Sequence, residues 1–280
     1  MKPNYLFIGA SKCATSSICA LLGQHPDIFM VSEEVGFFSL EEVYIKGFDW
    51  YESLFDQANN VKRWGEGSNW YTMKELFPET ITRIISYVPD AKLIYSVRHP
   101  IDRIESYWLE IRSHGSEKVH YDFNRAVELN RDWLIDSSNY WQQISAYRTH
   151  FSDDQILVIF YEDFKENPNA VMRRCFEFLE VDPNVPVTNP KLHLNPSMGK
   201  KAPIDFLSRL RSYPIYRNGI KLIPKGLRES VREKFLLKRI QGRPQWSVGS
   251  RKYVADILEA DTCRFLEYYG KPKTFWDLRQ

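Results

Sequence analysis

Residues 5–23 constrain the fold of this chain more than any other stretch of the sequence. They open with the apolar run Tyr-Leu-Phe-Ile, whose length and aromatic and β-branched side chains are typical of a buried strand. A turn of small residues with one lysine follows, and apolar side chains then recur at helical spacing up to Gly23, which can end a helix. The stretch therefore predicts a strand, a short loop and a helix near the start of an α/β fold.

The loop between this strand and this helix has the composition of an anion-binding site. Its small residues, Gly9 to Ser11, allow backbone N–H groups to approach a ligand, and Lys12 adds a cation. Hydroxyl side chains stand where the helix would start, at Thr15, Ser16 and Ser17. Free N–H groups and the dipole at a helix N-terminus favour negative charge, so the loop predicts a phosphate cradle. The alternative is an ordinary first strand-to-helix turn that binds nothing.

The position of the lysine does not fit the common form of such a cradle. A Walker A loop places its lysine directly before Ser or Thr in G-x-x-x-x-G-K-[ST]. Here Lys12 stands three residues before Thr15, and Ala14 replaces the second glycine. Cys13 lies inside the loop, where we favour a small residue tolerated beside a ligand over a reactive thiol.

Composition narrows the class of protein. A chain of 280 residues can bury a large core and permits one or two domains, and we see no linker that requires two. The net charge of +2 is too small to indicate a nucleic-acid partner. The four cysteines lack metal-ligand spacing and predict free thiols. No signal peptide or membrane anchor is visible, so we expect a cytoplasmic protein without a membrane partner.

A second candidate ligand site follows the apolar run of residues 92–97. The run predicts a buried strand, and Arg98 stands directly after it. Pro100 suits the first turn of a helix, in which Ser106 lies on a face roughly opposite the apolar stripe. Because α/β sheets bind ligands at the carboxyl ends of their strands, we expect Arg98 near a ligand. A solvated strand end is the alternative.

These two motifs together resemble those of sulfotransferases that use 3'-phosphoadenosine 5'-phosphosulfate (PAPS). The loop around Lys12 is similar to their 5'-phosphosulfate loop, K-x-G-T-[TS], with Ala14 in place of the family glycine. The sequence from Arg98 to Tyr107 is similar to their 3'-phosphate motif, R-[DNH]-P-x-x-R-x-x-S-x-[YF]. Both motifs occur in the family's order, and the resemblance extends to Trp276.

The resemblance implies a set of cofactor-binding residues. Lys12 would neutralise charge on the bridging phosphate oxygen, and Arg98 with Ser106 would hold the 3'-phosphate, while a C-terminal turn closes over it. The full set is Ser11, Lys12, Cys13, Ala14, Thr15, Ser16, Ser17, Arg98, Ser106, Ser250, Arg251, Lys252 and Tyr253. The cofactor would be PAPS and its product 3',5'-ADP (PAP). No metal is expected, because these groups do the clamping.

The resemblance also assigns a catalytic base. Relatives of the heparan sulfate enzymes carry K-E-x-x-F-F, and this spacing puts their glutamate at Glu34, three residues before Phe37. A partly desolvated carboxylate there could take the proton of a hydroxyl or amine acceptor as it attacks sulfur. Glu33 replaces the family lysine and is an alternative base, and a solvated surface glutamate is the alternative without function.

The acceptor region departs from the heparan-type pattern. The family's G-E-K-[ST]-P-x-Y corresponds to residues 65–71, with Gly67 for the lysine and Asn69 for the proline. Basic or polar positions are therefore lost, which favours a small-molecule acceptor, such as a secondary metabolite, over a sulfated polysaccharide. The residues expected to line the acceptor site are Glu33, Phe37, Trp70 and Tyr71. Trp70 and Tyr71 could equally belong to the core.

We therefore predict one sulfotransferase domain over residues 1–280, an α/β, P-loop-like three-layer fold with a central, mainly parallel sheet flanked by helices. It would transfer a sulfuryl group from PAPS, with Lys12 and Glu34 as catalytic residues. Alternatives are O-sulfation of a glycan, a P-loop kinase or NTPase, and a non-catalytic module that binds PAP or a polyanion. Homodimer formation is left open.

Three further features have less specific explanations. The basic segment 200–243 could contact a polyanion or a membrane surface, but we favour a solvated helical face that covers the cofactor. The acidic end of the apolar run 155–163, with Glu162 and Asp163, could be a Walker B element that coordinates magnesium, although the family shares this ending. His114 and His120 have no obvious partner and are expected to be solvated.

Overall fold

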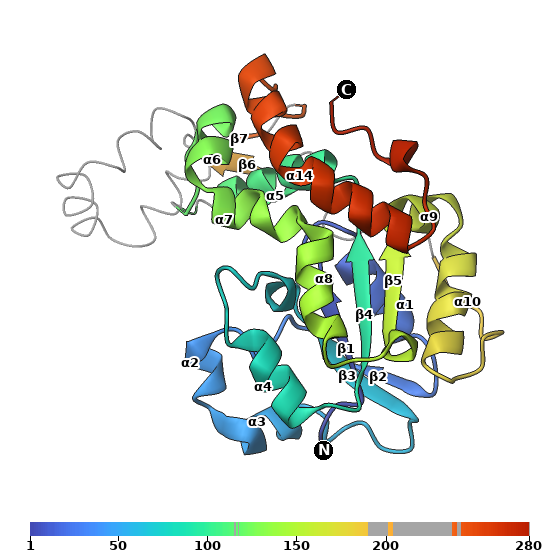
Figure 1. Cartoon of the computed structure of the whole chain (residues 1–280). Coiled ribbons are helices and arrows are strands. Elements are labelled where there is room, and N and C mark those ends of the chain that lie inside the picture. The colour runs from blue at the N-terminus through green and yellow to red at the C-terminus, as the bar shows by residue number, and fades with distance from the viewer. Residues whose placement is uncertain (115, 117, 190–200, 204–236, 240–241, 280) are drawn as a thin grey trace, which may run out of the picture.

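The computed structural model describes residues 1–114, 116, 118–189, 201–203, 237–239 and 242–279. Its centre is a parallel sheet of five strands in the order β2-β3-β1-β4-β5. The strands are β1 (Tyr5–Gly9), β2 (Ile28–Met30), β3 (Arg63–Gly67), β4 (Lys92–Val97) and β5 (Ile156–Phe160). Figure 1 shows β4 and β5 as arrows that point the same way, so their carboxyl ends meet at one edge. The predicted fold class is confirmed.

Both faces of this sheet are buried, and the side chains of each strand alternate between them. In β1, Leu6 and Ile8 join one hydrophobic cluster while Tyr5 and Phe7 join the other. A strand covered on both faces needs apolar side chains at every position, which explains the continuous apolar run in the sequence.

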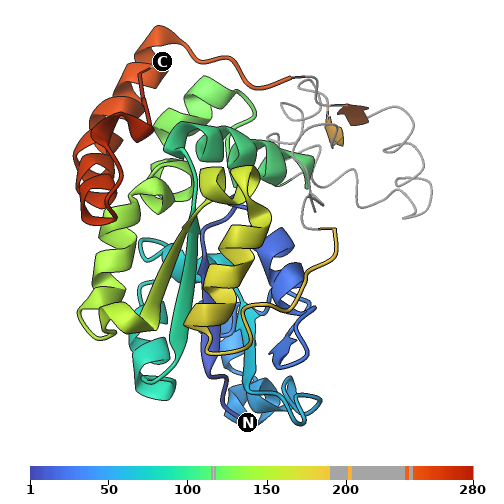
Figure 2. The same ribbon diagram turned by 90° about the vertical axis from the view of Figure 1, so that its right-hand side faces the viewer.

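Helices form a layer on each face (Figure 2). On one face α1 (Thr15–Leu22) packs against α10 (Pro168–Phe178). On the other face lie α4 (Thr80–Tyr87), α8 (Tyr140–Arg148) and the end of α14 (Val248–Tyr268). The helix α5 (Pro100–Ser113) runs above the carboxyl ends of the strands, packed in a third cluster with α6 (Phe123–Leu129), α7 (Arg131–Leu134) and α14.

Short elements complete the described fold. They are α2 (Glu41–Tyr44), α3 (Gly47–Ser53), α9 (Tyr161–Glu166), the antiparallel pair β6 (Lys201–Pro203) and β7 (Leu237–Arg239), and the 3-10 turns η1 (Asn69–Thr72), η2 (Asp136–Ser138), η3 (Asp153–Gln155) and η6 (Lys273–Phe275). Most of the basic segment 200–243 lies outside the described residues. In the described part of the chain, no helix has both the length and the apolar character needed to cross a bilayer.

One predicted element is wrong. The sequence suggested a turn over residues 247–253, but α14 begins at Val248, so all but the first of these residues are helical. The side chain of Ser247 accepts a hydrogen bond from the backbone N–H of Ser250 at 3.0 Å. A serine at the N-cap satisfies one of the otherwise unpaired N–H groups of a helix start, and this outweighs Gly249 in the first turn.

Candidate functional site

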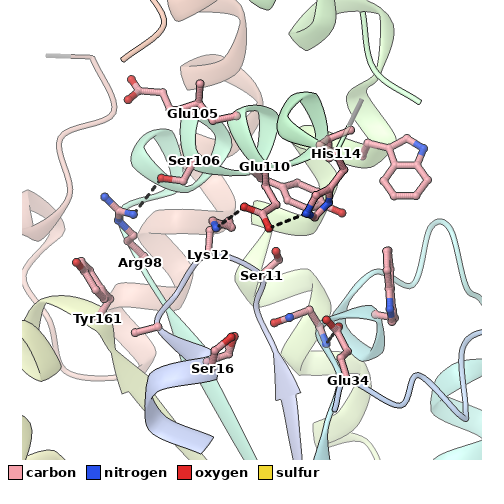
Figure 3. A pocket seen from close by; sticks show the side chains of 18 of the residues that line it. Ser11, Lys12, Ser16, Glu34, Arg98, Glu105, Ser106, Glu110, His114 and Tyr161 are labelled. Carbon is pink, nitrogen blue, oxygen red and sulfur yellow. Dashed lines mark hydrogen bonds and ion pairs between the residues drawn. The ribbon is translucent and has the colours of Figure 1, made fainter. Parts of the chain in front are cut away.

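A cavity of about 570 Å³ opens at the carboxyl ends of the sheet. Each of the five strands is followed by a residue that lines it: Ser11 after β1, Glu34 after β2, Asn69 after β3, Arg98 after β4 and Tyr161 after β5. This is the edge at which parallel α/β sheets bind ligands. Figure 3 shows Arg98, Ser106 and Tyr161 at one end, Lys12 and Glu110 in the middle, and Glu34 and His114 toward the other end.

The loop between β1 and α1 forms the floor of the cavity. Lys12 and Ala14 have φ angles of 69° and 64°, in the left-handed region. Glycine adopts that conformation more easily than alanine, so Ala14 carries a strain of about 1–2 kcal/mol that the family glycine avoids. The loop residues that line the cavity are Ser11, Lys12, Ala14, Thr15, Ser16 and Ser17.

The N-terminus of α1 is open toward this cavity. No side chain caps the helix at Ala14. The first N–H groups of a helix have no partner within the helix, and the dipole adds partial positive charge at the same place. The geometry therefore suits a phosphate or sulfate group, as the sequence predicts.

Cys13 points away from this site, into the core. The residue is fully buried, and its Sγ lies 3.6 Å from the backbone oxygen of Ser11. Burial raises the pKa of Cys13 to about 12, so the thiol stays protonated at neutral pH. A reactive thiol is therefore not supported, and only the backbone of Cys13 could contact a ligand.

Lys12 is held by an acidic partner that the sequence motifs did not include. Its Nζ lies 3.0 Å from Oε2 of Glu110, and the two side chains are only 11% and 20% exposed. The other oxygen of Glu110 lies 3.6 Å from Nε2 of His114, which also lines the cavity. Glu110 follows Ser106 by four residues and precedes His114 by four, a spacing that places all three on one face of α5. This spacing in the sequence could have identified Glu110 and His114 as residues of the site.

Arg98 is oriented by several contacts at the opposite end. Its guanidinium donates to the Ser106 hydroxyl and to the Asp102 carboxylate, both at 3.2 Å, and lies 4.8 Å from the centroid of the Tyr161 ring. The Tyr140 hydroxyl fixes the Arg98 backbone by donating to its carbonyl oxygen at 2.8 Å. Among the described residues, Nε of Arg98 is buried without a hydrogen-bond partner. An unpaired buried donor here fits an anionic ligand.

A further cation reaches this end from the C-terminal part of the chain. Arg243 lines the cavity, and its Nη1 lies 2.7 Å from Oδ1 of Asp102. The second carboxylate at this end, Glu105, accepts from the indole N–H of Trp246 at 2.7 Å and lies 3.6 Å from Arg243. The sequence analysis placed Arg243 in the basic segment and gave it no individual role.

The four C-terminal residues predicted to bind the cofactor do not line the cavity. Ser250 is buried at the start of α14, and Arg251 donates from Nε to the Leu278 carbonyl oxygen at 2.8 Å. Lys252 forms an ion pair with Asp256 on the same helix, and Tyr253 is 39% exposed. These residues are helical and not part of a closing turn, whereas Arg243 supplies a cation to the cavity wall.

Glu34 faces the cavity from the segment after β2. Its Oε1 accepts a hydrogen bond from the backbone N–H of Asn69 at 2.7 Å. Burial raises the pKa of Glu34, the bonds from Asn69 oppose this, and the charge of Glu110 adds to the rise. The Glu34 side chain is still exposed to solvent through the cavity. It therefore belongs to the cavity wall and not to the core. Glu33 is exposed and does not line the cavity.

The predicted acceptor residues divide between the cavity and the core. Trp70 lines the cavity, together with Trp133 of α7 and Lys118, neither of which the sequence analysis singled out. Phe37 instead stacks on Tyr51 with ring centroids 4.2 Å apart, and Tyr71 is fully buried. Phe37 and Tyr71 therefore pack in the core and do not line the cavity.

A side chain at Gly67 would meet close neighbours. A Cβ atom at this position would lie 3.1 Å from the Met30 side chain, 3.2 Å from Sγ of Cys19 and 3.3 Å from Cβ of Phe7. The neighbouring strands and α1 would therefore have to shift by a few tenths of an ångström to admit the lysine of the heparan-type motif.

Comparison with known proteins agrees with this geometry. Residues 2–227 match the family model of the sulfotransferase domain. The mouse bifunctional heparan sulfate N-deacetylase/N-sulfotransferase 3 is 28% identical over 202 residues, covering 65% of this chain and 23% of that protein. The mouse heparan sulfate glucosamine 3-O-sulfotransferase 5 is 25% identical over 207 residues, covering 70% of this chain and 58% of that protein. The chain thus spans about a quarter of the length of the first relative, at 23%.

Solved structures share the fold. A sulfotransferase from Alicyclobacillus acidocaldarius superposes with a TM-score of 0.68 at 22% identity, covering 97% of each chain. The sulfotransferase domain of the Synechococcus PCC 7002 olefin synthase gives a TM-score of 0.50 at 18% identity, covering 91% of this chain and 94% of that one. The matched domain spans more than half of the sequence, and the structure has the parallel central sheet that was predicted. The chain therefore belongs to the PAPS-dependent sulfotransferase family.

Proposed function

We propose that this protein transfers the sulfuryl group of PAPS to a hydroxyl or amine of a small-molecule acceptor. The observation that carries the proposal is that Lys12, the open N-terminus of α1, Arg98 with Ser106, and Glu34 all line one cavity. The groups for phosphate lie at one end and in the middle, and the carboxylate lies toward the other end.

The phosphate end accounts for selection of the cofactor. The N-terminus of α1 and the hydroxyls of its first turn would hold the 5'-phosphate. Arg98, Ser106 and Arg243 would hold the 3'-phosphate, where the unpaired Nε of Arg98 gains a partner. A nucleotide such as ATP, without a 3'-phosphate, would leave these groups unsatisfied and bind more weakly.

The reaction requires a base that takes the proton of the acceptor molecule. It also requires a cation in the middle of the cavity. The acceptor oxygen or nitrogen forms a bond to sulfur while the bond from sulfur to the bridging phosphate oxygen breaks. Glu34 takes the proton of the acceptor, and Lys12 stabilises the negative charge that develops on the released oxygen. For this role Lys12 exchanges the Glu110 carboxylate for the phosphosulfate group.

The kinase alternative has less support. Asp163, a candidate magnesium ligand of a kinase, forms an ion pair with Lys271 at 2.8 Å and does not line the cavity. A glycan acceptor is also less well supported, because Gly67 stands where the heparan-type motif has a lysine. Sulfation by PAPS that persists in excess EDTA tests the proposed reaction class directly, and strict dependence on ATP and Mg²⁺ would reject it.

Replacing Arg98 by alanine should weaken binding of 3',5'-ADP by about 10- to 100-fold, because a charge-assisted hydrogen bond contributes about 1.5–3 kcal/mol. Binding of 5'-AMP, which lacks the 3'-phosphate, should change much less. Titration calorimetry with both nucleotides measures the difference. Arg173→Ala, on the outer surface of α10, is the control. An equal loss for both nucleotides would place Arg98 away from the 3'-phosphate.

Replacing Asn69 by proline should raise the pKa of Glu34 further. Asn69 is the first residue of η1 and follows an extended Ser68, so proline fits the backbone there while removing the N–H that favours the ionised carboxylate. Asn69→Ala keeps the N–H and should raise the pKa less. Carboxyl carbon NMR titration, with Glu34→Gln to identify the resonance, measures both. Equal titration of the proline and alanine variants would show that the N–H contributes nothing.

A further inference from the structure

Two tryptophans form an aromatic corner at the acceptor end of the cavity. Trp70 of η1 and Trp133 of α7 stand edge to face, with ring centroids 6.2 Å apart and planes at 89°. Both side chains line the cavity. We call Trp70 and Trp133 the aromatic corner.

The aromatic corner already holds a cation. The Lys118 ammonium lies 4.5 Å from the centroid of Trp133 and 5.9 Å from that of Trp70. Both distances are within the range at which the negative face of an indole attracts a cation, and tryptophan is the strongest aromatic partner for this interaction. An ammonium group of the protein itself thus shows which chemistry the corner accepts.

The surrounding charges favour the same kind of group. Glu34 accepts a hydrogen bond from the N–H of Asn69, the residue directly before Trp70. A carboxylate therefore lies close in space to the backbone that carries the aromatic corner. Among the described lining residues the other lysine and arginine side chains are engaged elsewhere, Lys12 with Glu110 and both Arg98 and Arg243 with Asp102. Positions 36 and 67 are glycines and contribute no cation.

We propose that the acceptor carries a positively charged group, a protonated amine or a quaternary ammonium, which takes the place of the Lys118 ammonium in the aromatic corner. The nucleophilic hydroxyl or neutral amine of the same molecule then reaches Glu34. This inference rests on the proposed function and adds the charge class of the substrate. The rival role for Lys118 is recognition of an anionic acceptor.

Three phenols built on one 4-ethylphenol skeleton separate these roles: tyramine, 4-ethylphenol itself and 3-(4-hydroxyphenyl)propanoate, whose ethyl chains carry an ammonium group, no further group and a carboxylate. We expect protein saturated with 3',5'-ADP to bind tyramine roughly fivefold or more tightly than 4-ethylphenol, and the acid most weakly. Titration calorimetry measures binding, and kcat/KM with PAPS should follow the same order. Equal binding of the three, or preference for the acid, would overturn the proposal.

Substitutions test whether the aromatic corner causes the preference for a cationic acceptor. Lys118→Met removes the competing cation and should increase the ratio of tyramine to 4-ethylphenol affinity, whereas Trp133→Leu should bring that ratio close to one. Lys46→Met is the matched control, since its ammonium lies 4.1 Å from the Trp50 ring outside the cavity. A lower ratio in Lys118→Met, or an unchanged one in Trp133→Leu, would refute the assignment.

Retained 3',5'-ADP binding reports a folded protein. Failure to bind 3',5'-ADP or to use PAPS in the wild type would instead reject the proposed function.

Discussion

Replacing Glu34 by glutamine is expected to lower the rate of sulfuryl transfer by about 10²–10⁴-fold, the usual contribution of a positioned general base. Glutamine has nearly the same shape and can still accept the Asn69 N–H, but it cannot take a proton. Affinity for 3',5'-ADP should be retained, because the side chains proposed to hold its phosphates lie in the middle and at the opposite end of the cavity. Single-turnover transfer from radiolabelled PAPS measures the chemical step without interference from product release.

Glu33→Gln is the matched control for this experiment. The side chain is the neighbouring carboxylate, but it is exposed and outside the cavity, so the variant should transfer at the rate of the wild type. Full activity of Glu34→Gln together with loss in Glu33→Gln would move the base to Glu33. Full activity of both variants would mean that neither carboxylate is the base.

Replacing Lys12 by methionine is expected to lower kcat by about 10²–10³-fold, the effect of removing one group that stabilises charge in a transition state. Methionine keeps most of the apolar stem, so the loop should retain its packing while the charge is lost. The variant also leaves Glu110 without the ammonium that lies 3.0 Å away, so the negative charge of this carboxylate faces an anionic cofactor. Binding of 3',5'-ADP should therefore weaken as well.

The double variant Lys12→Met with Glu110→Gln separates these two effects. It removes the repulsive carboxylate but does not restore the cation, so affinity for 3',5'-ADP should recover while kcat stays low. Recovery of kcat in the double variant would show that Lys12 acts only by neutralising Glu110 and has no part in stabilising the leaving oxygen.

The parts of this fold that the sequence predicted are those with a local signal. The apolar runs of β1, β4 and β5 and the spacing of α1 and α10 could be recognised without their neighbours. The strand β3 could not, because its sequence Arg-Trp-Gly-Glu-Gly has no apolar alternation. Its Glu66 is buried because Tyr51 and Tyr71 donate hydrogen bonds to it at 3.0 and 2.6 Å, and these partners come from elsewhere in the chain.

The candidate site shows the same division. Lys12, Arg98 and Ser106 belong to compact motifs, and their cavity positions match the prediction made from spacing. Trp133, Lys118 and Arg243 come from segments without a motif, and only the packing of α5, α7 and the C-terminal part brings them to the cavity. The turn predicted at Ser250 to Tyr253 is wrong, because Ser247 caps a helix that begins at Val248. The assignment of these residues to the cofactor stays a prediction.

Each of the five strands leads into a segment that lines the cavity, and this has a consequence for folding. A partly assembled sheet would lack at least one wall of the site, and a register slip of one residue would turn its side chains to the opposite face. Nucleotide binding is thus linked to formation of the complete sheet and should stabilise the native state by about 2.7 kcal/mol at a ligand concentration 100 times Kd. The cavity therefore also reports, through ligand-induced thermal stabilisation, whether a variant has formed its whole sheet.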